Sequence, residues 1–154
     1  MEYSEQRTIT VTAYPIRLSV RYVEMFSKFA KQYLANNRQG IKKRDIQDLV
    51  NVEVTTFHHL EYFGLITRYG EEQGNEWHLS KDGEQFFAGQ EPVFDLIAHM
   101  DGEILPLNHE CWDTNKDKPK LTMIWEIMKQ SQREWEEYTH YKEIRKSSFQ
   151  KKLF

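Results

Sequence analysis

Two short helical periods, joined by a few residues, limit what this chain can fold into more than any other feature does. Residues 41–50 and 55–63 each repeat apolar side chains at helical spacing, and residues 51–54 leave room only for a tight connection. Gly64 ends the second period, because glycine adopts a left-handed backbone at little cost. Two helices this short and this close together predict a helix-turn-helix.

The flanking residues predict strands and one longer helix. Residues 8–14 alternate apolar and polar side chains and are rich in β-branched residues, so they predict a strand that Pro15 ends. Residues 18–34 repeat apolar side chains every three or four positions, which is typical of a helix. Residues 65–69 and 76–79 predict two strands of a hairpin around a polar loop with two glycines.

Turn signals continue after this hairpin. Ser80 is expected to cap a short helix over residues 81–88, which Gly89 ends. Asp101-Gly102 lies between two apolar runs and predicts a second hairpin. Residues 106–120 are polar and contain two prolines, so we expect a surface linker there.

Residues 121–154 predict one long C-terminal helix. The apolar stripe of this helix consists of Leu121, Ile124, Trp125, Met128, Trp135, Tyr138 and Tyr141. This spacing suits a helix–helix seam, formed either with residues 18–34 or with a second subunit. We expect the aromatic side chains of the stripe to pack within protein rather than to stack on nucleobases.

The charges are unevenly distributed although their sum is small. The 154 residues include 21 Lys and Arg and 24 Asp and Glu, for a net charge of −3. Residues 61–110 hold two basic and eleven acidic side chains, whereas residues 1–60 and 111–154 each hold three more basic than acidic ones. A surface that binds nucleic acid is therefore expected outside the middle of the sequence.

Cysteine use and hydropathy indicate the cellular compartment. The single Cys111 excludes a disulfide framework within the chain and favours a reducing environment. No stretch approaches the roughly 20 apolar residues that span a bilayer, and the first residues lack the basic flank and apolar run of a signal peptide. We expect a cytoplasmic protein that does not insert into membranes.

The residue pattern does not favour catalysis or metal binding. His58 and His59 are adjacent, so at most one of them can point into the core, and neither has Cys or acidic partners at metal-ligand spacing. His109 and Cys111 lie two residues apart in the expected linker, where no pocket for a nucleophile is indicated. We therefore expect a non-enzymatic protein without metal or cofactor.

Two runs of the sequence resemble a known family. The run LEYFGLITR over residues 60–68 is similar to the L-x-x-x-G-L-I-x-R join between recognition helix and wing in winged helix-turn-helix proteins. The run WHLSKDGEQFFAG over residues 77–89 resembles the W-x-L-T-x-x-G-x-x-F-x-x-G run that closes the wing in many bacterial regulators. With the following Asp-Gly hairpin, residues 41–105 look like the small winged-helix proteins of bacteriophages and prophages.

The resemblance implies an α+β fold, namely a winged helix-turn-helix with an N-terminal strand and a long C-terminal helix. The implied organisation is a winged-helix domain over residues 1–105, a linker over 106–120 and a C-terminal helix over 121–154 that packs or dimerises. The implied function is that of a phage or mobile-element transcriptional regulator that binds double-stranded DNA as a homodimer. The residues expected to contact DNA are Lys42, Lys43, Arg44, Thr55, Thr56, His58, His59 and Arg68.

The expected wing departs from this pattern and supports a second hypothesis. Its tip contains Glu71, Glu72 and Glu76, where a DNA-binding wing presents Arg or Lys to phosphate. An acidic wing instead favours a module that binds a host protein and inhibits a nucleic-acid-binding or defence complex. If the wing merges with Glu84, Glu91, Asp95 and Glu103 into one acidic patch, this second hypothesis gains support.

Overall fold

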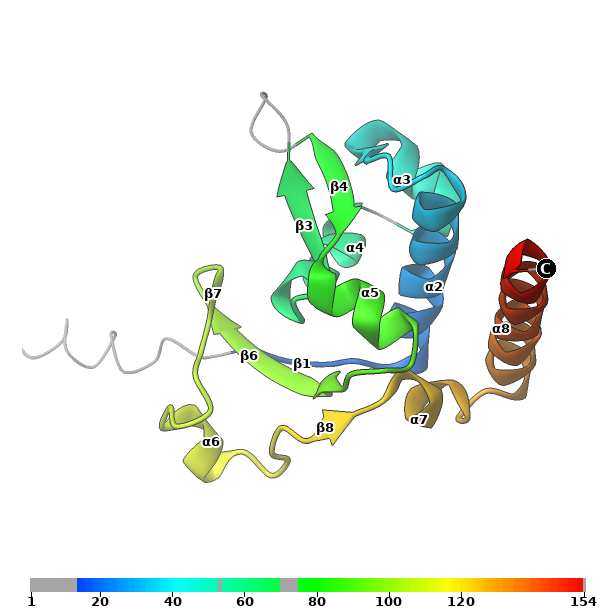
Figure 1. Ribbon diagram of the computed structural model, residues 1–154. Coiled ribbons are helices and arrows are strands. Elements are labelled where there is room, and N and C mark those ends of the chain that lie inside the picture. Colours follow the sequence, from blue (N-terminus) through cyan, green and yellow to red (C-terminus); the bar gives the residue numbers. More distant parts are fainter. Residues whose placement is uncertain (1–13, 53, 70–74, 154) are drawn as a thin grey trace, which may run out of the picture.

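The computed structural model describes residues 14–52, 54–69 and 75–153, which form an α+β fold of seven helices and three small antiparallel sheets (Figure 1). Its first half contains, in order, β1 (Tyr14–Arg17), α2 (Val20–Ala35), β2 (Ile41–Lys42), α3 (Lys43–Val50), α4 (Val54–Tyr62), β3 (Ile66–Tyr69), β4 (Glu76–Leu79) and α5 (Lys81–Phe87). Its second half contains β5 (Val93–Phe94), β6 (Leu96–Met100), β7 (Glu103–Ile104), α6 (Cys111–Thr114), β8 (Leu121–Thr122), α7 (Ile124–Met128) and α8 (Gln132–Leu153).

Helix α2 is the centre of the hydrophobic core. Its Phe29 ring lies 5.2 Å from the ring of Phe57 in α4, which in turn lies 5.6 Å from Trp77 in β4. Its Phe26 ring lies 5.9 Å from Phe86 in α5. All five side chains are fully buried, so α2 supplies the surface on which α4, the hairpin and α5 pack.

The short elements predicted between residues 41 and 79 are confirmed. Helix α3 ends at Asn51, which adopts a left-handed backbone with φ of 58°, and α4 ends before Gly64, where φ is 74°. Strands β3 and β4 form the expected hairpin, and the sheet order is β2-β4-β3. These two tight turns connect α3 to α4 and α4 to the hairpin, so the three elements follow one another with short connections.

One boundary in this region differs from the prediction. The helix expected over residues 41–50 begins at Lys43, because residues 41–42 form strand β2. Ile41 pairs with Trp77 and Lys42 with Glu76 in antiparallel register. Pairing buries the β-branched Ile41 in the core, which outweighs continuation of the helical spacing.

A second sheet has the order β1-β6-β7 and corrects the prediction for Pro15. Pro15 lies inside β1 opposite Ala98, whereas the sequence predicted that it ends a strand. Proline is tolerated there because β1 is an edge strand, whose outward positions need no backbone donor. The strand predicted over residues 8–14 lies outside the described residues except for Tyr14.

The hairpin predicted at Asp101-Gly102 is confirmed. Met100 pairs with Glu103, so β6 and β7 are joined by a two-residue turn. Both turn residues have positive φ, 53° at Asp101 and 81° at Gly102. This geometry matches the right-handed twist of the strands and explains why the dipeptide predicts the hairpin.

The segment expected as a linker over residues 106–120 is partly structured. It contains α6, and its Trp112 side chain is 4% exposed. Trp112 packs with Leu96 and Ala98 of β6 in a small second core. Packing on this face of the sheet removes the large aromatic side chain of Trp112 from water. The polar composition of residues 106–120 does not indicate this packing.

The prediction of a single helix over residues 121–154 is wrong for its first part. Residues 121–122 form β8, which pairs with β5, and the chain then forms α7 before α8 begins. The buried side chains of α7 belong to the main core, and the Tyr138 hydroxyl of α8 donates a 2.8 Å hydrogen bond to the Phe87 carbonyl. Most of the expected seam therefore packs against its own chain, whereas Leu121 and Trp125 of the same stripe are exposed.

Gly83 provides a test of how α5 packs. The Ser80 hydroxyl caps α5, accepting a 2.8 Å hydrogen bond from the Gly83 N–H, and a methyl group on Gly83 would collide with the Leu65 carbonyl oxygen. We expect Gly83→Ala to lower the free energy of unfolding by about 3 kcal/mol, measured by urea denaturation. Gly64→Ala has open space and costs only the left-handed backbone, about 1 kcal/mol, so equal losses would contradict this packing.

Candidate nucleic-acid interface

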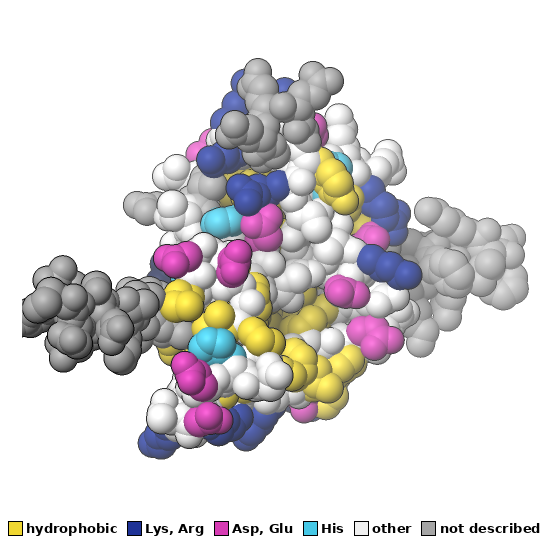
Figure 2. Space-filling model, turned by 90° about the vertical axis from the view of Figure 1, so that its left-hand side faces the viewer, with side chains coloured by type: hydrophobic (Ala, Val, Ile, Leu, Met, Phe, Trp, Pro, Cys, Tyr) yellow, Lys and Arg dark blue, Asp and Glu magenta, His cyan; other side chains and the backbone are white. Residues whose placement is uncertain are grey.

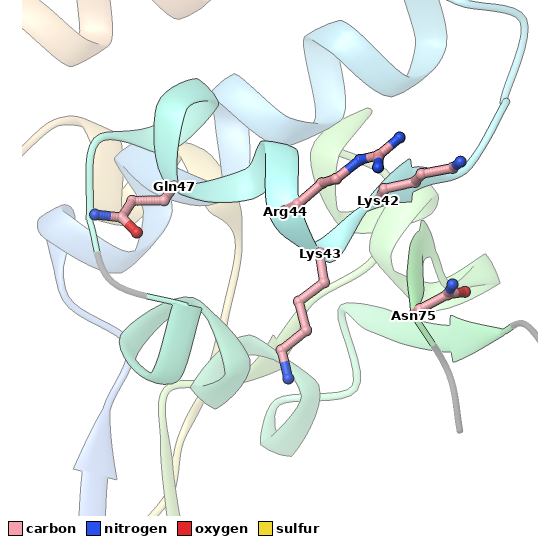
Figure 3. Close-up of a pocket in the computed structure, with 5 residues that line it drawn as sticks. All are labelled: Lys42, Lys43, Arg44, Gln47 and Asn75. Carbon is pink, nitrogen blue, oxygen red and sulfur yellow. The ribbon is translucent and has the colours of Figure 1, made fainter. Parts of the chain in front are cut away.

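Three consecutive cations lie where β2 meets α3. Lys42 ends β2, Lys43 and Arg44 begin α3, and all three side chains are exposed. With Gln47 and Asn75 they line a shallow pocket of about 440 Å³. Figure 3 shows Lys42 and Arg44 extending in a similar direction, whereas Lys43 extends to another side of the helix start.

The backbone holds this cluster beside the hairpin. The Lys43 N–H donates a 2.8 Å hydrogen bond to the Asn75 carbonyl, just before β4 begins. Pairing of β2 with β4 places Lys42 opposite Glu76. The sheet, rather than the flexible lysine side chains, therefore fixes where the positive charge lies.

The basic cluster, Lys42, Lys43 and Arg44, is not neutralised by neighbouring carboxylates in the described part of the chain. No ion pair within 4.0 Å joins any of the three to an acidic side chain there. By contrast, Arg17 and Arg38 each form an ion pair, with Asp95 and Glu84 respectively. Cations without a protein partner remain available to an external anion.

Helix α4 presents fewer free polar groups than the sequence predicts. Thr55 is exposed, Thr56 is half-buried, and neither has a side-chain hydrogen bond among the described residues. The His58 Nε2 lies 3.0 Å from the Glu61 carboxylate, and the His58 ring packs 5.8 Å from Trp77. Of these three side chains, Thr55 is the most accessible to a ligand.

His59 points toward α2 instead of outward. Its Nδ1 forms a 2.7 Å hydrogen bond with the Tyr22 hydroxyl, and its ring stacks on Tyr62. Burial, together with nearby His58 and His99, lowers the pKa of His59 below the ordinary value of 6.5. His59 is therefore neutral at pH 7 and contributes to packing, whereas the sequence placed it among residues that contact DNA.

Arg68 forms contacts with both Glu61 and Trp77. Its Nε donates a 3.0 Å hydrogen bond to the Glu61 carboxylate, and its guanidinium lies 5.4 Å from the centre of the Trp77 ring. Glu61 thus interacts with two of the predicted DNA contacts, His58 and Arg68. The carboxylate reduces the positive potential of this part of the surface.

The acidic residues named in the second hypothesis are partly paired where the structure describes them. Glu71 and Glu72 lie outside the described residues, and Glu76 begins β4 opposite Lys42. Two of the four other carboxylates are neutralised, Glu84 by Arg38 at 2.7 Å and Asp95 by Arg17 at 3.4 Å. Glu91 and Glu103 remain exposed.

Two residues beside the basic cluster were missed from the sequence. Gln47 lies four residues after Lys43 on α3, so helical spacing was sufficient to find it. Asn75 is 32 positions away from Lys43 in the sequence, and only the pairing of β2 with β4 brings it there. Both carry amide groups able to bond phosphate or base edges.

The described residues offer little for metal or thiol chemistry. They contain no group of three or more His, Cys, Asp or Glu side chains placed to hold a metal ion. The Cys111 N–H donates a 3.0 Å hydrogen bond to His109 Nδ1, and burial raises the pKa of the Cys111 thiol. A thiol with a raised pKa stays protonated and is a poor nucleophile.

Comparison with protein-family models, with curated proteins and with solved structures finds no match for this chain. None of the helices described combines the length and the apolar character that crossing a membrane requires.

The lowered pKa of His59 predicts a pH-dependent stability. The unfolded chain binds a proton at His59 more readily than the folded protein does, so the free energy of unfolding falls as pH drops below 6.5. We expect His59→Gln to reduce this fall, measured by urea denaturation at about pH 7.5 and about pH 5.5. His140→Gln, an exposed position on α8, is the control, and an unchanged fall in His59→Gln would contradict the prediction.

Proposed function

We propose that this protein binds double-stranded DNA through a winged helix-turn-helix and acts as a non-enzymatic transcriptional regulator. The proposed domain consists of α2, β2, α3, α4 and the β3–β4 hairpin, with α4 as recognition helix and the hairpin as wing. The sheet order β2-β4-β3 and the packing of α4 and the hairpin on α2 support this assignment.

The observation that carries the proposal is the basic cluster. Lys42, Lys43 and Arg44 are exposed, adjacent and without ion-pair partners among the described residues, at the start of the helix that precedes α4. Cations at this point of a helix-turn-helix contact the phosphate backbone while the next helix faces the major groove. Contacts with phosphate release counterions, so affinity depends steeply on salt.

Base recognition is expected to be limited. Thr55 is the exposed polar residue near the start of α4, and a threonine hydroxyl forms one contact rather than the bidentate pairs of Arg, Asn or Gln. Gln47 lies beside the basic cluster and has an amide suited to adenine. We therefore propose that phosphate contacts supply most of the affinity and that sequence preference is modest.

Charge reversal in the basic cluster tests the proposal. We expect Lys43→Glu combined with Arg44→Glu to abolish binding to mixed-sequence duplex DNA, measured by fluorescence anisotropy at about 50 mM and about 200 mM salt. The unaltered protein should lose affinity steeply between these conditions, with the three cations contributing about −2.7 to the slope of log K against log salt.

The matched control is Lys116→Glu combined with Lys118→Glu, two exposed lysines in a segment distant from α3 in the sequence. This control has the same net charge as the test variant, and we expect it to keep most of the affinity. Absence of binding at low salt in the unaltered protein, or equal losses in both variants, would overturn the proposal.

Removing the carboxylate of Glu61 should strengthen DNA binding. Glu61→Gln frees Arg68 from its 3.0 Å ion pair and deletes a negative charge from α4, so one more cation can contact phosphate. We expect affinity to rise by about threefold to tenfold at low salt, in the same anisotropy measurement. Glu103→Gln, exposed on β7, should leave affinity nearly unchanged, and weaker binding by Glu61→Gln would contradict this role.

A further inference from the structure

An apolar groove lies on a part of the molecule that the proposed DNA contacts do not use. Its volume is about 420 Å³, and the C-terminal end of α4, α5 and the strands β5 to β8 line it. The apolar side chains that line this groove are Phe63, Val93, Phe94, Ile97, Ile104 and Leu121. None of the eight predicted DNA contacts is among its lining residues.

The groove is unusually apolar for an exposed surface. Among the described residues six large apolar side chains are exposed, and three of them line the groove: Phe94 at 36%, Ile104 at 44% and Leu121 at 60%. Figure 2 shows hydrophobic side chains gathered on the lower half of this face, with acidic side chains near them. Apolar surface concentrated in this way marks an interaction site.

The charges that line the groove have a single sign. Asp82 and Glu91 line it, both are exposed, and no Lys, Arg or His does so. Neither carboxylate forms an ion pair within the described part of the chain. A matching ligand therefore combines apolar side chains with positive charge.

One segment of the chain itself has this composition. Residues 144–154, IRKSSFQKKLF, hold four basic side chains, four large apolar ones and no carboxylate. We call them the basic segment. Their side chains carry a net charge of +4, which complements the acidic groove, and each basic pair adjoins one apolar residue, Ile144 or Leu153.

The described first half of α8 packs away from the groove of its own chain. Two contacts hold it against α2 and the residue that follows α5. Arg133 forms a 3.1 Å ion pair with Glu24 of α2, and the Lys142 ammonium donates a 3.3 Å hydrogen bond to the Ala88 carbonyl. Figure 1 shows α8 and β7 on opposite sides of the molecule.

We propose that the basic segment of one molecule binds the acidic apolar groove of a second copy. A reciprocal exchange of two such segments places the same pair of surfaces at both contacts and closes the assembly as a two-fold dimer. The dimer buries Phe94, Ile104 and Leu121, which are exposed in the single chain. This inference does not depend on DNA binding, because it uses neither the basic cluster nor α4's N-terminal half.

Sedimentation equilibrium of the full chain tests the proposal. We expect a dimer whose dissociation is visible between about 1 µM and about 100 µM protein, and which weakens as salt screens the charges. Asp82→Lys combined with Glu91→Lys should raise the dissociation constant by about tenfold, and Lys151→Glu combined with Lys152→Glu should do the same. Thermal melting of each variant verifies that the fold is retained.

Combining all four substitutions distinguishes a direct contact from independent effects. If the segment lies in the groove, the charges are again complementary and the dissociation constant returns toward that of the unaltered protein. A synthetic peptide of residues 144–154 should also bind the Lys151→Glu, Lys152→Glu chain at concentrations below its dissociation constant, and should compete with dimer formation by the unaltered protein. Glu110→Lys combined with Asp113→Lys, exposed positions that do not line the groove, is the matched control and should leave the dimer unchanged.

Three results would overturn the proposal. The first is a monomer at every concentration, which would leave the groove to a basic segment of another protein. The second is a dimer that the groove and segment reversals do not weaken. The third is a variant with all four substitutions whose loss of dimerisation free energy equals the sum of the losses in the two double variants, because a direct contact predicts rescue.

Discussion

The structure depends on the burial of one face of α2 by aromatic side chains from later in the chain. Phe29 contacts Phe57, Phe57 contacts Trp77, and these contacts join α2, α4 and β4 in one continuous aromatic cluster. Because all three rings are fully buried, the positions of α4 and the hairpin are set by core packing. The surface groups on these elements therefore have a fixed arrangement, and a binding partner contacts them in that arrangement.

The charged side chains on these elements differ between the start of α3 and the end of α4. At the start of α3, the backbone bond from Lys43 to Asn75 holds three cations together without carboxylate partners among the described residues. At the end of α4, Glu61 pairs with Arg68 and so removes a cation from those proposed to contact phosphate. The balance between these two features decides how strongly the proposed interface attracts phosphate.

The second half of the chain supports the first and also adds a surface of its own. Helix α7 and Tyr138 of α8 complete the core around α2 and α5, so these C-terminal residues stabilise the fold of the single chain independently of any assembly. The strands β5 to β8 leave Ile104 and Leu121 exposed beside Glu91. An apolar groove with acidic side chains differs in chemistry from the basic cluster, so the two surfaces fit different partners.

The sequence by itself determined the elements whose signals are local. Gly64 and the Asp101-Gly102 turn marked their boundaries because positive φ restricts residue choice at single positions. Only the tertiary structure decided the rest. Residues 41–42 became a strand and Asn75 joined the basic cluster because β2 pairs with β4, while His59 turned inward because Tyr22 lies within 2.7 Å. Contacts between residues far apart in the sequence produce no periodic pattern of residues, so they cannot be predicted from a local stretch of sequence.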